Sequence, residues 1–401
     1  MTQAFSGVRI VDFTQVLAGP FATQQLALLG AEVIKIEQPG HGDQTRGLMN
    51  DAKDAAAGMS PAFMTCNMGK RSLTLNLKSA HAKDIVQRLV QRADVVVENF
   101  KAGVMDRLGF GFTALQEFKS DLIYCSISGY GQTGPKAGIP AYDGAIQADS
   151  GMMSITGYPE TGPTRTGYMP VDMATALNAA FAISTALYRK LATGEGQRID
   201  VAMMDTAVVM QTIQITNYLA TGKVPQLIGN RSPTGHPTAN AFKTADGHIN
   251  VLALREPQVA SLFEIVGLAQ AYQDDRFSNG PARITHYDEV CSMLSEVLLR
   301  EDSAHWLEQF ATAGVPAASI RSYAEVVDDE QFQHRNTFIE FPSPVDPSKN
   351  TRLIRAGYET AEDGPTTDIP PPRLGEHTQE ILTELGFSDT AIETFRKERV
   401  V

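Results

Sequence analysis

Residues 8–37 read VRIVDFTQVLAGPFATQQLALLGAEVIKIE, and this stretch decides the fold class. Val8–Phe13 is a short apolar run typical of a buried strand. Phe21–Leu29 has a helical pattern that ends at Gly30, and Ala31–Glu37 is a second strand-like run. Strand, loop, helix and strand in close succession predict a βαβ unit and therefore a parallel sheet. The loop after the first strand is where open α/β sheets bind ligands.

Strand-like and helical segments keep alternating over the following hundred residues. Further strands are predicted at 71–77, 94–98 and 122–128, with helical patterns at 80–93 and 105–108. This alternation predicts a doubly wound, Rossmann-like α/β domain.

The first strand-to-helix loop bears on one class of enzyme. Its sequence, QVLAGPF over residues 15–21, lacks the GxGxxG fingerprint that lets a backbone approach a dinucleotide pyrophosphate. A dehydrogenase is therefore disfavoured, although Glu37 stands where a ribose-binding acid would stand.

The sequence changes character after residue 222. A segment rich in Pro, Gly and Asn is followed by a predicted hairpin around Ala245-Asp246-Gly247 and then by helical patterns. We expect a large α/β domain over residues 1–222, a smaller α+β domain over 223–327, and a C-terminal segment, 328–401, that returns to the large domain.

Composition narrows the function. The chain has 401 residues and a net charge of −12, which argues against a general binder of nucleic acid or anionic membranes. Three cysteines form no CxxC pair and no metal-binding spacing, so no metal is expected and a reducing compartment is favoured. We see neither a signal peptide nor a membrane-spanning run, and expect a cytoplasmic protein.

Asp172 is the candidate nucleophile. It stands between Pro170 and a long Ala-rich run, Met173–Leu191, as a helix N-cap does. A carboxylate at an N-cap receives backbone N–H groups and the positive end of the helix dipole, so we expect Asp172 to stay ionised. From these residues alone, Asp172 either caps the helix or also attacks a substrate.

Basic residues gather at predicted loop positions of the first domain. In an acidic protein such a concentration can form a rim that binds phosphate, although each residue can also be plain solvated charge. The residues concerned are Lys35, Arg46, Lys70, Arg71, Lys101, Arg107 and Lys136.

Several stretches, in order along almost the whole chain, resemble the class III CoA-transferase family, which includes formyl-CoA transferases, carnitine CoA-transferases and α-methylacyl-CoA racemases. They are VDFTQVLAGP (11–20), GAEVIKIE (30–37), GDQTR (42–46), NMGKRSLTLNL (67–77), ENF (98–100), SISGYGQ (126–132), GEGQ (194–197) and LGEHT (374–378). Each motif is weak, and together they are specific.

The resemblance implies a homodimer whose two chains are interlocked like links, and it implies site residues. Asp172 matches the catalytic aspartate of the family. Arg46 and Arg107 would meet the phosphates or adenine of CoA, and Asn99 and Phe100 would border its pantetheine arm. The implied CoA site comprises Val16, Arg46, Leu75, Asn99, Phe100, Arg107 and Lys136, and the implied acyl pocket comprises Leu17, Tyr142, Asp143, Gly235 and His236.

The implied reaction needs no permanently bound cofactor, because the CoA thioester is itself the substrate. Asp172 attacks an acyl-CoA, and a mixed anhydride forms as CoA thiolate leaves. The thiolate then attacks the aspartyl carbonyl, giving an aspartyl-CoA thioester and the free donor acid, and an acceptor carboxylate reverses the steps. Water must be excluded, and the Gly-rich segments 131–138 and 229–235 are candidate mobile covers.

Two other functions remain as alternatives. A racemase needs two proton-transfer groups, and the racemases of the family carry a His followed by Asp where this chain has Tyr142-Asp143, so transfer is favoured. A non-catalytic acyl-CoA binder would not need an aspartate at position 172.

The substrate is less defined by the sequence. The formyl-CoA transferases have a Gln at the position of Leu17 and a run of glycines at the position of Ser232–His236, so oxalate is not expected. Arg231 and His236 would suit a second carboxylate, which favours a short dicarboxylate such as succinate or a methyl-branched relative.

Overall fold

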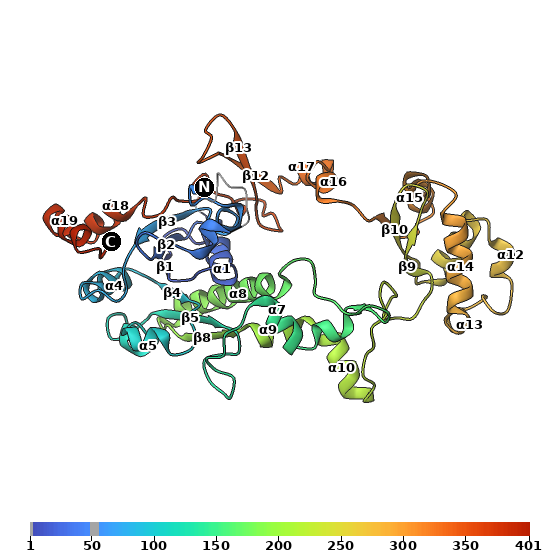
Figure 1. Cartoon of the computed structure of the whole chain (residues 1–401), viewed down its shortest axis with the longest axis horizontal. Helices are drawn as coiled ribbons and strands as arrows, with labels where there is room; N and C mark the ends of the chain where they lie inside the picture. Colours follow the sequence, from blue (N-terminus) through green and yellow to red (C-terminus); the bar gives the residue numbers. More distant parts are fainter. Residues whose placement is uncertain (1–2, 49–55) are drawn as a thin grey trace. The chain divides into compact units, whose positions relative to one another are not determined.

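The computed structural model describes residues 3–48 and 56–401, and its main feature is a parallel sheet (Figure 1). Within the described residues this sheet has six strands in the order β3-β2-β1-β4-β5-β8. Counted along the chain, the order is 3-2-1-4-5-6, the doubly wound arrangement, which confirms the predicted α/β class. The strands are β1 (Arg9–Asp12), β2 (Glu32–Glu37), β3 (Lys70–Thr74), β4 (Val95–Glu98), β5 (Ile123–Ser128) and β8 (Arg198–Ala202).

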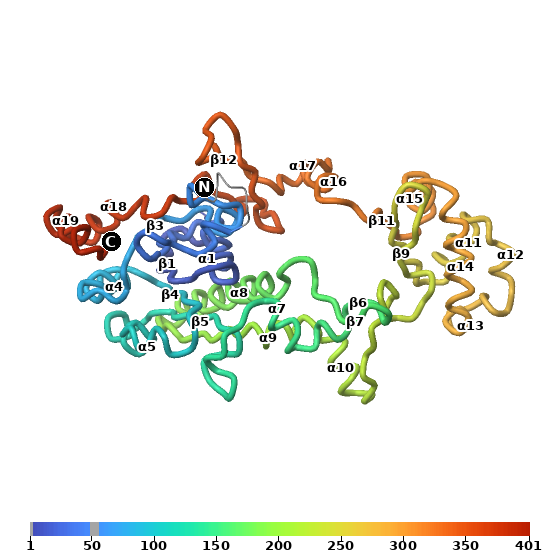
Figure 2. The backbone as a smooth tube through the Cα atoms, in the orientation of Figure 1, coloured from blue at the N-terminus to red at the C-terminus, as the bar shows by residue number. Residues whose placement is uncertain are grey.

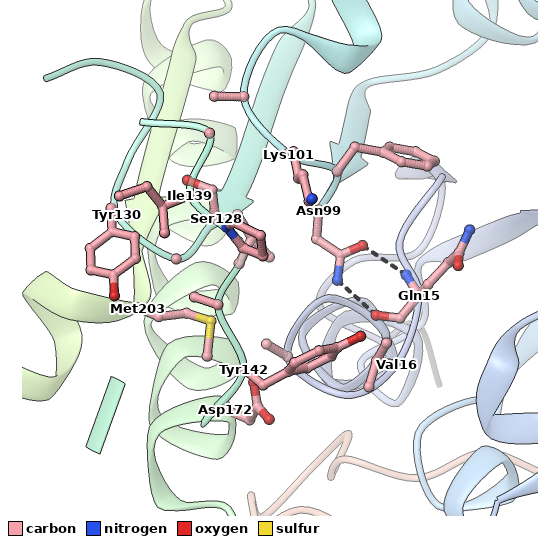
Figure 3. A pocket seen from close by; sticks show the side chains of 18 of the residues that line it. Gln15, Val16, Asn99, Lys101, Ser128, Tyr130, Ile139, Tyr142, Asp172 and Met203 are labelled. Carbon is pink, nitrogen blue, oxygen red and sulfur yellow. Dashed lines mark hydrogen bonds between the residues drawn. The ribbon is translucent and has the colours of Figure 1, made fainter. Parts of the chain in front are cut away.

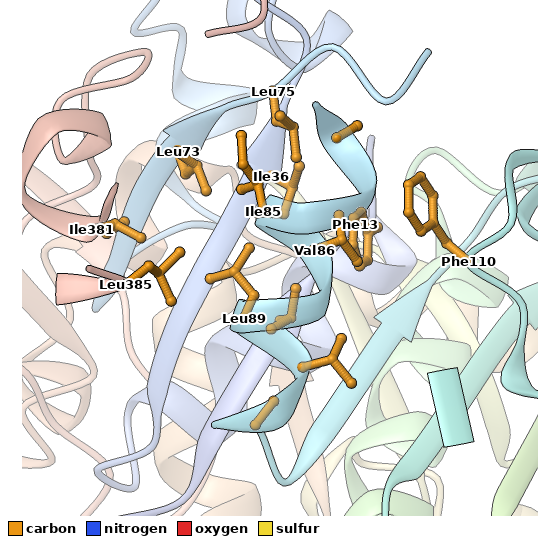
Figure 4. Packing of buried hydrophobic residues seen from close by; sticks show 14 of the residues in the cluster. Phe13, Ile36, Leu73, Leu75, Ile85, Val86, Leu89, Phe110, Ile381 and Leu385 are labelled. Carbon is orange, nitrogen blue, oxygen red and sulfur yellow. The ribbon is translucent and has the colours of Figure 1, made fainter. Parts of the chain in front are cut away.

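Helices cover both faces of this sheet because its strands carry apolar side chains on both sides. On one face, α1 (Ala18–Ala27) and α8 (Pro170–Thr193) pack over Ile10, Val33 and Val97. On the other face, α4 (Ala82–Gln91), α18 (Thr378–Glu384) and α19 (Asp389–Lys397) pack over Phe13, Leu73 and Tyr124. Figure 4 shows Phe13 and Leu73 in this cluster, together with Ile85 and Ile381.

The sheet has a topological switch point between β1 and β4, its two central strands. From β1 the chain proceeds to β2 and β3 on one side, and from β4 it proceeds to β5 and β8 on the other. The loops that follow β1 and β4 therefore diverge and leave a crevice at the carboxyl ends of the strands.

Chain contacts divide the protein into two units. The first contains the residues up to Met152, Thr166–Gly222 and Glu330–Val401, and the second contains Met153–Arg165 and Lys223–Asp329. Compared with the expected boundaries, the second unit also takes the small hairpin of β6 (Gly157–Tyr158) and β7 (Gly162–Pro163). The backbone N–H of Gly229 bonds to the carbonyl of Gly157 at 2.9 Å, which explains this reassignment.

The second unit has its own core around a small antiparallel sheet. The hairpin predicted around Asp246 is formed by β9 (Ala239–Lys243) and β10 (His248–Leu252), and β11 (Ala317–Ser319) adds a third strand within the described residues. Its helices are α11 (Glu256–Ile265), α12 (Ala269–Tyr272), α13 (Gly280–Thr285), α14 (Tyr287–Leu298), α15 (Ser303–Thr312) and α16 (Tyr323–Val327).

The C-terminal segment belongs to the first unit, where it packs beside β3 (Figure 2). The hydroxyl of Thr378 accepts the backbone N–H of Thr74 at 3.1 Å, and Ile381 and Leu385 complete the core on that face. The sequence reading missed two of its elements, the hairpin of β12 (Phe338–Pro342) and β13 (Asn350–Ile354), and the helix α19.

Short elements complete the first unit. They are η1 (Gln44–Gly47), α3 (Pro61–Met64), α5 (Val104–Leu108), α6 (Phe112–Gln116), α7 (Asp143–Asp149), α9 (Met203–Met210), α10 (Thr212–Thr221) and α17 (Glu330–His334), with η2 (Met152–Ile155) at its boundary with the second unit. None of the helices in residues 3–48 and 56–401 has the length and apolar character that crossing a membrane requires.

Candidate active site

A pocket of about 320 Å³ lies at the switch point of the sheet (Figure 3). Its walls come from three loops at the carboxyl ends of strands and from the start of α8. Residues that line it are Gln15, Val16, Leu17 and Ala18 after β1, Asn99, Phe100, Lys101 and Ala102 after β4, Ser128 to Gly131 and Gly138 to Tyr142 after β5, and Gln44, Ile127, Asp172 and Met203. Asp172 and Tyr142 thus share one pocket with Val16, Leu17, Asn99 and Phe100 from the predicted set.

Asp172 does not cap its helix, and this expectation was wrong. The helix α8 begins at Pro170, its N-cap is Met169, and Asp172 lies within the first turn. The sequence pattern misplaced the start because a proline suits the first turn of a helix as well as the residues before it.

Asp143 performs the capping role from a different helix. Its carboxylate oxygen accepts the backbone N–H groups of Val171 at 2.8 Å and of Asp172 at 3.0 Å. The other oxygen of Asp143 accepts the amide N–H of Gln147, one turn along α7. Asp143 is buried and is not among the residues that line the pocket. It therefore supports the backbone of Asp172, which differs from the prediction that it lines the acyl pocket.

The protonation of Asp172 also differs from the expectation. Burial, and next the nearby charge of Asp143, raise the pKa of the Asp172 carboxyl to about 7. Among the described residues its carboxyl group has no hydrogen-bond partner, so nothing offsets the cost of burying its charge. A carboxyl group with a pKa near 7 is half ionised at neutral pH and is more nucleophilic than an ordinary aspartate.

Tyr142 is the residue beside Asp172 in the pocket. Its side chain is 66% exposed, and Figure 3 shows it next to Asp172 on the side toward Val16. A phenol in this place gives the pocket an aromatic wall. Among the residues that line the pocket in the described chain, none is a histidine.

A second groove, of about 270 Å³, lies beside the pocket on the same unit. It shares Gln15 and Phe100 with the pocket, and Leu75 lines it together with Val104 and Leu108 of α5. Pocket and groove together offer one long, partly apolar path that crosses the carboxyl ends of β1 and β4.

Arg46 is placed differently from the expectation that it meets CoA phosphates. Its guanidinium is buried and makes two bonds to Glu37, at 2.7 and 2.8 Å, and further bonds to the carbonyls of Gly58 and Pro372. It also lies over the ring of Phe63, 3.6 Å from the centroid. In this structure Arg46 joins segments of the first unit and presents no free face to a phosphate.

Three further basic residues of the expected phosphate-binding rim also form ion pairs within the protein. Lys35 and Lys70 are fully buried and pair with Asp43 and Asp12, at 3.1 and 3.0 Å. Arg71 bridges to Glu32, Glu380 and Glu384, which ties β3 to α18. The rim prediction is therefore wrong for these three residues. The sequence could not show this, because a buried lysine and an exposed lysine look alike until their partners are known.

Three basic residues of that set remain exposed. Lys101 lines the pocket, and Arg107 lies near the end of α5, whose other face lines the groove. Lys136 projects from the loop after β5, pairs with Asp149 at 2.5 Å and lies 5.1 Å from the ring centre of Tyr130. Gly131 and Gly138, on either side of Lys136, both line the pocket.

Gly235 and His236 belong to the second unit and are not among the residues lining the pocket. Arg231, in the same segment, lies over the ring of Tyr287 at 4.4 Å and is 3.5 Å from a carboxylate oxygen of Asp288.

Sequence reasoning missed several pocket residues, among them Gln15, Ser128, Ile139 and Met203. Ser128 ends β5, and its hydroxyl oxygen is buried without a hydrogen-bond partner. Its place at the carboxyl end of a predicted strand is a signal that could have identified it.

Comparison with known proteins shows the family of the chain. Residues 5–378 match the family described as CoA-transferase family III. The chain is 36% identical to succinate–glutarate CoA-transferase of Agrobacterium fabrum, over 95% of each chain. It is 37% identical to acetyl-CoA:oxalate CoA-transferase of Acetobacter aceti, over 95% of this chain and 96% of the other. A CAIB/BAIF family protein of Brucella suis superposes with a TM-score of 0.84 at 33% identity, over 96% of this chain and 100% of the other. The chain therefore belongs to CoA-transferase family III and is a class III CoA-transferase.

Proposed function

We propose that this enzyme moves CoA between two short dicarboxylic acids, with Asp172 as the nucleophile. The observation that carries the proposal is the place of Asp172 at the wall of the switch-point pocket, with its carboxyl group free of hydrogen bonds and its backbone fixed by Asp143. Attack on a thioester is favoured by a weakly solvated carboxylate, and the burial of the Asp172 carboxyl group supports this role.

The reaction then proceeds through covalent intermediates on Asp172. An Asp172 oxygen bonds to the donor acyl carbon while the carbon–sulfur bond breaks, giving a mixed anhydride and CoA thiolate. The thiolate attacks the aspartyl carbonyl, which releases the donor acid and leaves an aspartyl-CoA thioester. An acceptor carboxylate repeats these steps in reverse. Every bond formed replaces one broken, and no atom changes its oxidation state, so the proposed steps need no redox group.

CoA is proposed to follow the path of pocket and groove. The thioester lies next to Asp172, the pantetheine arm passes Asn99 and Phe100, and the far end of CoA lies near Leu75 and α5. Exposed cations near this path are candidates for its phosphates, and they include Lys78 in the groove wall, Lys101 in the pocket wall, Arg107 and Lys136. Arg46 is not proposed as a phosphate ligand.

The names of similar proteins support a dicarboxylic substrate. The two relatives above are named for transfer to or from succinate, glutarate or oxalate, all of which have two carboxyl groups. We propose succinate or a related acid as one of the pair.

We further propose that two chains form the homodimer that the family resemblance implies. Apolar side chains at helical spacing line one side of α8 and are exposed, namely Leu177 at 54%, Phe181 at 70%, Tyr188 at 75% and Leu191 at 85%. A stripe of this size on a long helix calls for a partner that covers it.

The cysteines Cys66, Cys125 and Cys291 are free thiols, which suits the reducing, cytoplasmic compartment expected from the sequence.

Two alternatives make different demands on the same pocket. A racemase needs a second proton-transfer group opposite Asp172, and the side chain nearest to that role here is the phenol of Tyr142. A non-catalytic binder would show no exchange of CoA between acids.

One experiment tests the proposal. The protein is incubated with succinyl-CoA and a panel of carboxylic acids, and new CoA esters are identified by mass spectrometry. Wild type is expected to form glutaryl-CoA or a related ester, and Asp172→Ala to form none. In wild type, borohydride treatment or hydroxylamine should modify Asp172 during turnover. Full activity of Asp172→Ala would contradict the mechanism, and epimerisation of a 2-methylacyl-CoA without transfer would support the racemase.

A further inference from the structure

The pocket wall formed by Gln15–Ala18 contains a strained residue. Val16 has a φ of 71°, in the left-handed region that β-branched side chains avoid. Tertiary contacts must therefore hold Val16 against its own preference, and such over-determined strain is concentrated at functional sites.

Asp43 makes the contact that holds Val16. The backbone N–H of Val16 donates to the Asp43 carboxylate, with distances of 3.2 and 3.1 Å to its two oxygens. The same carboxylate accepts the N–H and the hydroxyl of Thr45, at 2.9 and 2.8 Å, and an ammonium N–H of Lys35 at 3.1 Å. Asp43 is 1% exposed, so these bonds fix its position from every side.

Lys35 keeps this carboxylate ionised. Burial alone would raise the pKa of Asp43, but Lys35 and the bonds from Thr45 hold it below its usual range. Lys35 also donates to the backbone carbonyl of Thr14 at 2.8 Å, two residues before Val16. The buried ion pair of Lys35 and Asp43 therefore holds the loop by hydrogen bonds to the backbone of Thr14 and of Val16.

Asn99 holds the backbone of Gln15, the residue between Thr14 and Val16. Its side-chain oxygen accepts the N–H of Gln15 at 2.8 Å, and its amide donates to the carbonyl of Gln15 at 2.7 Å, as the dashed lines in Figure 3 show. Thr14, Gln15 and Val16 are thus each fixed by a side chain from another part of the chain. Of these contacts, the hydrogen bond that the Asp43 carboxylate accepts from Val16 is the one that acts on the strained residue.

We propose that Asp43 is a positioning residue for CoA binding, which keeps Val16 in its left-handed conformation and so shapes the wall of the pocket beside Asp172. This inference rests on the proposed function of the pocket as the CoA thioester site. Asp43 itself does not line the pocket, so its effect on the substrate passes through the backbone of Val16.

A double-mutant cycle tests the proposal, because glycine adopts the left-handed conformation without strain. The variants are Asp43→Asn, Val16→Gly and the two combined, and the readouts are the Kd for CoA by calorimetry together with kcat and KM for succinyl-CoA. Asp43→Asn is expected to weaken CoA binding about tenfold in the Val16 background, and less than about twofold when Val16→Gly is also present. A merely structural role of Asp43 gives no such rescue.

Asp94→Asn is the matched control. Asp94 also accepts a backbone N–H, from Arg9 at 3.1 Å, and an ammonium N–H, from Lys190 at 2.9 Å, but it precedes β4 at the opposite end of the sheet. It is expected to leave the Kd unchanged and to show no coupling to Val16→Gly. If Asp43→Asn does not fold, Lys35→Met/Asp43→Asn, which removes both charges, replaces it in the cycle.

The outcomes separate the two proposals. Equal losses from Asp43→Asn in both backgrounds, in a wild type that binds CoA, would overturn the positioning role alone. A wild type that binds neither CoA nor succinyl-CoA would contradict the proposed function, and the positioning role would fall with it.

Discussion

The carboxylate of Asp143 accepts the backbone N–H of Asp172 at 3.0 Å, and its charge helps to raise the pKa of the Asp172 side chain. One buried residue thus fixes the first turn of α8 and also raises the pKa of the proposed nucleophile. The pair is formed by two helices, α7 and α8, that come together only in the folded chain.

This pairing predicts the pH dependence of the enzyme. Attack requires the ionised form of Asp172, so kcat/KM should rise about tenfold per pH unit below 7 and level off above it, in line with a pKa of about 7. Asp143→Asn keeps an oxygen for the backbone but removes the charge, so the rising limb should move to lower pH. Rates measured between pH 5 and 9 check this, and an unshifted limb in Asp143→Asn would contradict the role given to Asp143.

Tyr142 is expected to act as an aromatic wall. Tyr142→Ala should raise the KM for the acyl-CoA about tenfold through lost contact area, with a smaller effect on kcat. Tyr142→Phe is the control and should stay within about twofold of wild type, since the ring remains. Loss of activity in Tyr142→Phe would instead give its hydroxyl a part in proton transfer.

Arg46 is expected to matter for stability and not for phosphate binding. Arg46→Met leaves Glu37 buried without its partner, which should lower the free energy of unfolding by about 3–5 kcal/mol. Urea unfolding measures this loss, and Glu37→Gln/Arg46→Met should recover part of it because no unpaired charge remains. If Arg46→Met instead weakens the affinity for CoA and leaves the free energy of unfolding unchanged, Arg46 binds a CoA phosphate and the structural role is contradicted.

The apolar stripe of α8 predicts a dimer that one charge can disrupt. Phe181→Glu should shift the protein from dimer toward monomer, since a carboxylate cannot be buried in an apolar interface without a large cost. Sedimentation velocity at several protein concentrations gives the distribution. Lys83→Glu, at an exposed position of α4, is the control and should leave the dimer intact. A wild type that is monomeric at all concentrations would contradict the interface.

In the Pro-rich C-terminal region, sequence patterns did not predict the strands β12 and β13 or the helix α19. The hairpin of β12 and β13 lies in a stretch whose prolines hide any strand alternation, and α19 follows directly on α18. Both elements are defined by what they pack against, as the contact of Phe395 with the core beneath α4 illustrates.

The sequence by itself determined the parallel α/β class, because the alternation of apolar strands with amphipathic helices over the first 130 residues has few other solutions. It also predicted Asp172 and its neighbours as site residues, through a family likeness carried by short motifs. Only the tertiary structure decided which charges are buried in ion pairs and which remain exposed. Lys35, Arg46 and Lys70 turned out to be buried ion-pair partners, and Asp143 turned out to cap the helix that Asp172 was expected to cap. The physical reason is that the sequence does not show whether a charged side chain is solvated or paired. Its pKa and its role depend on partner residues that lie far away along the chain.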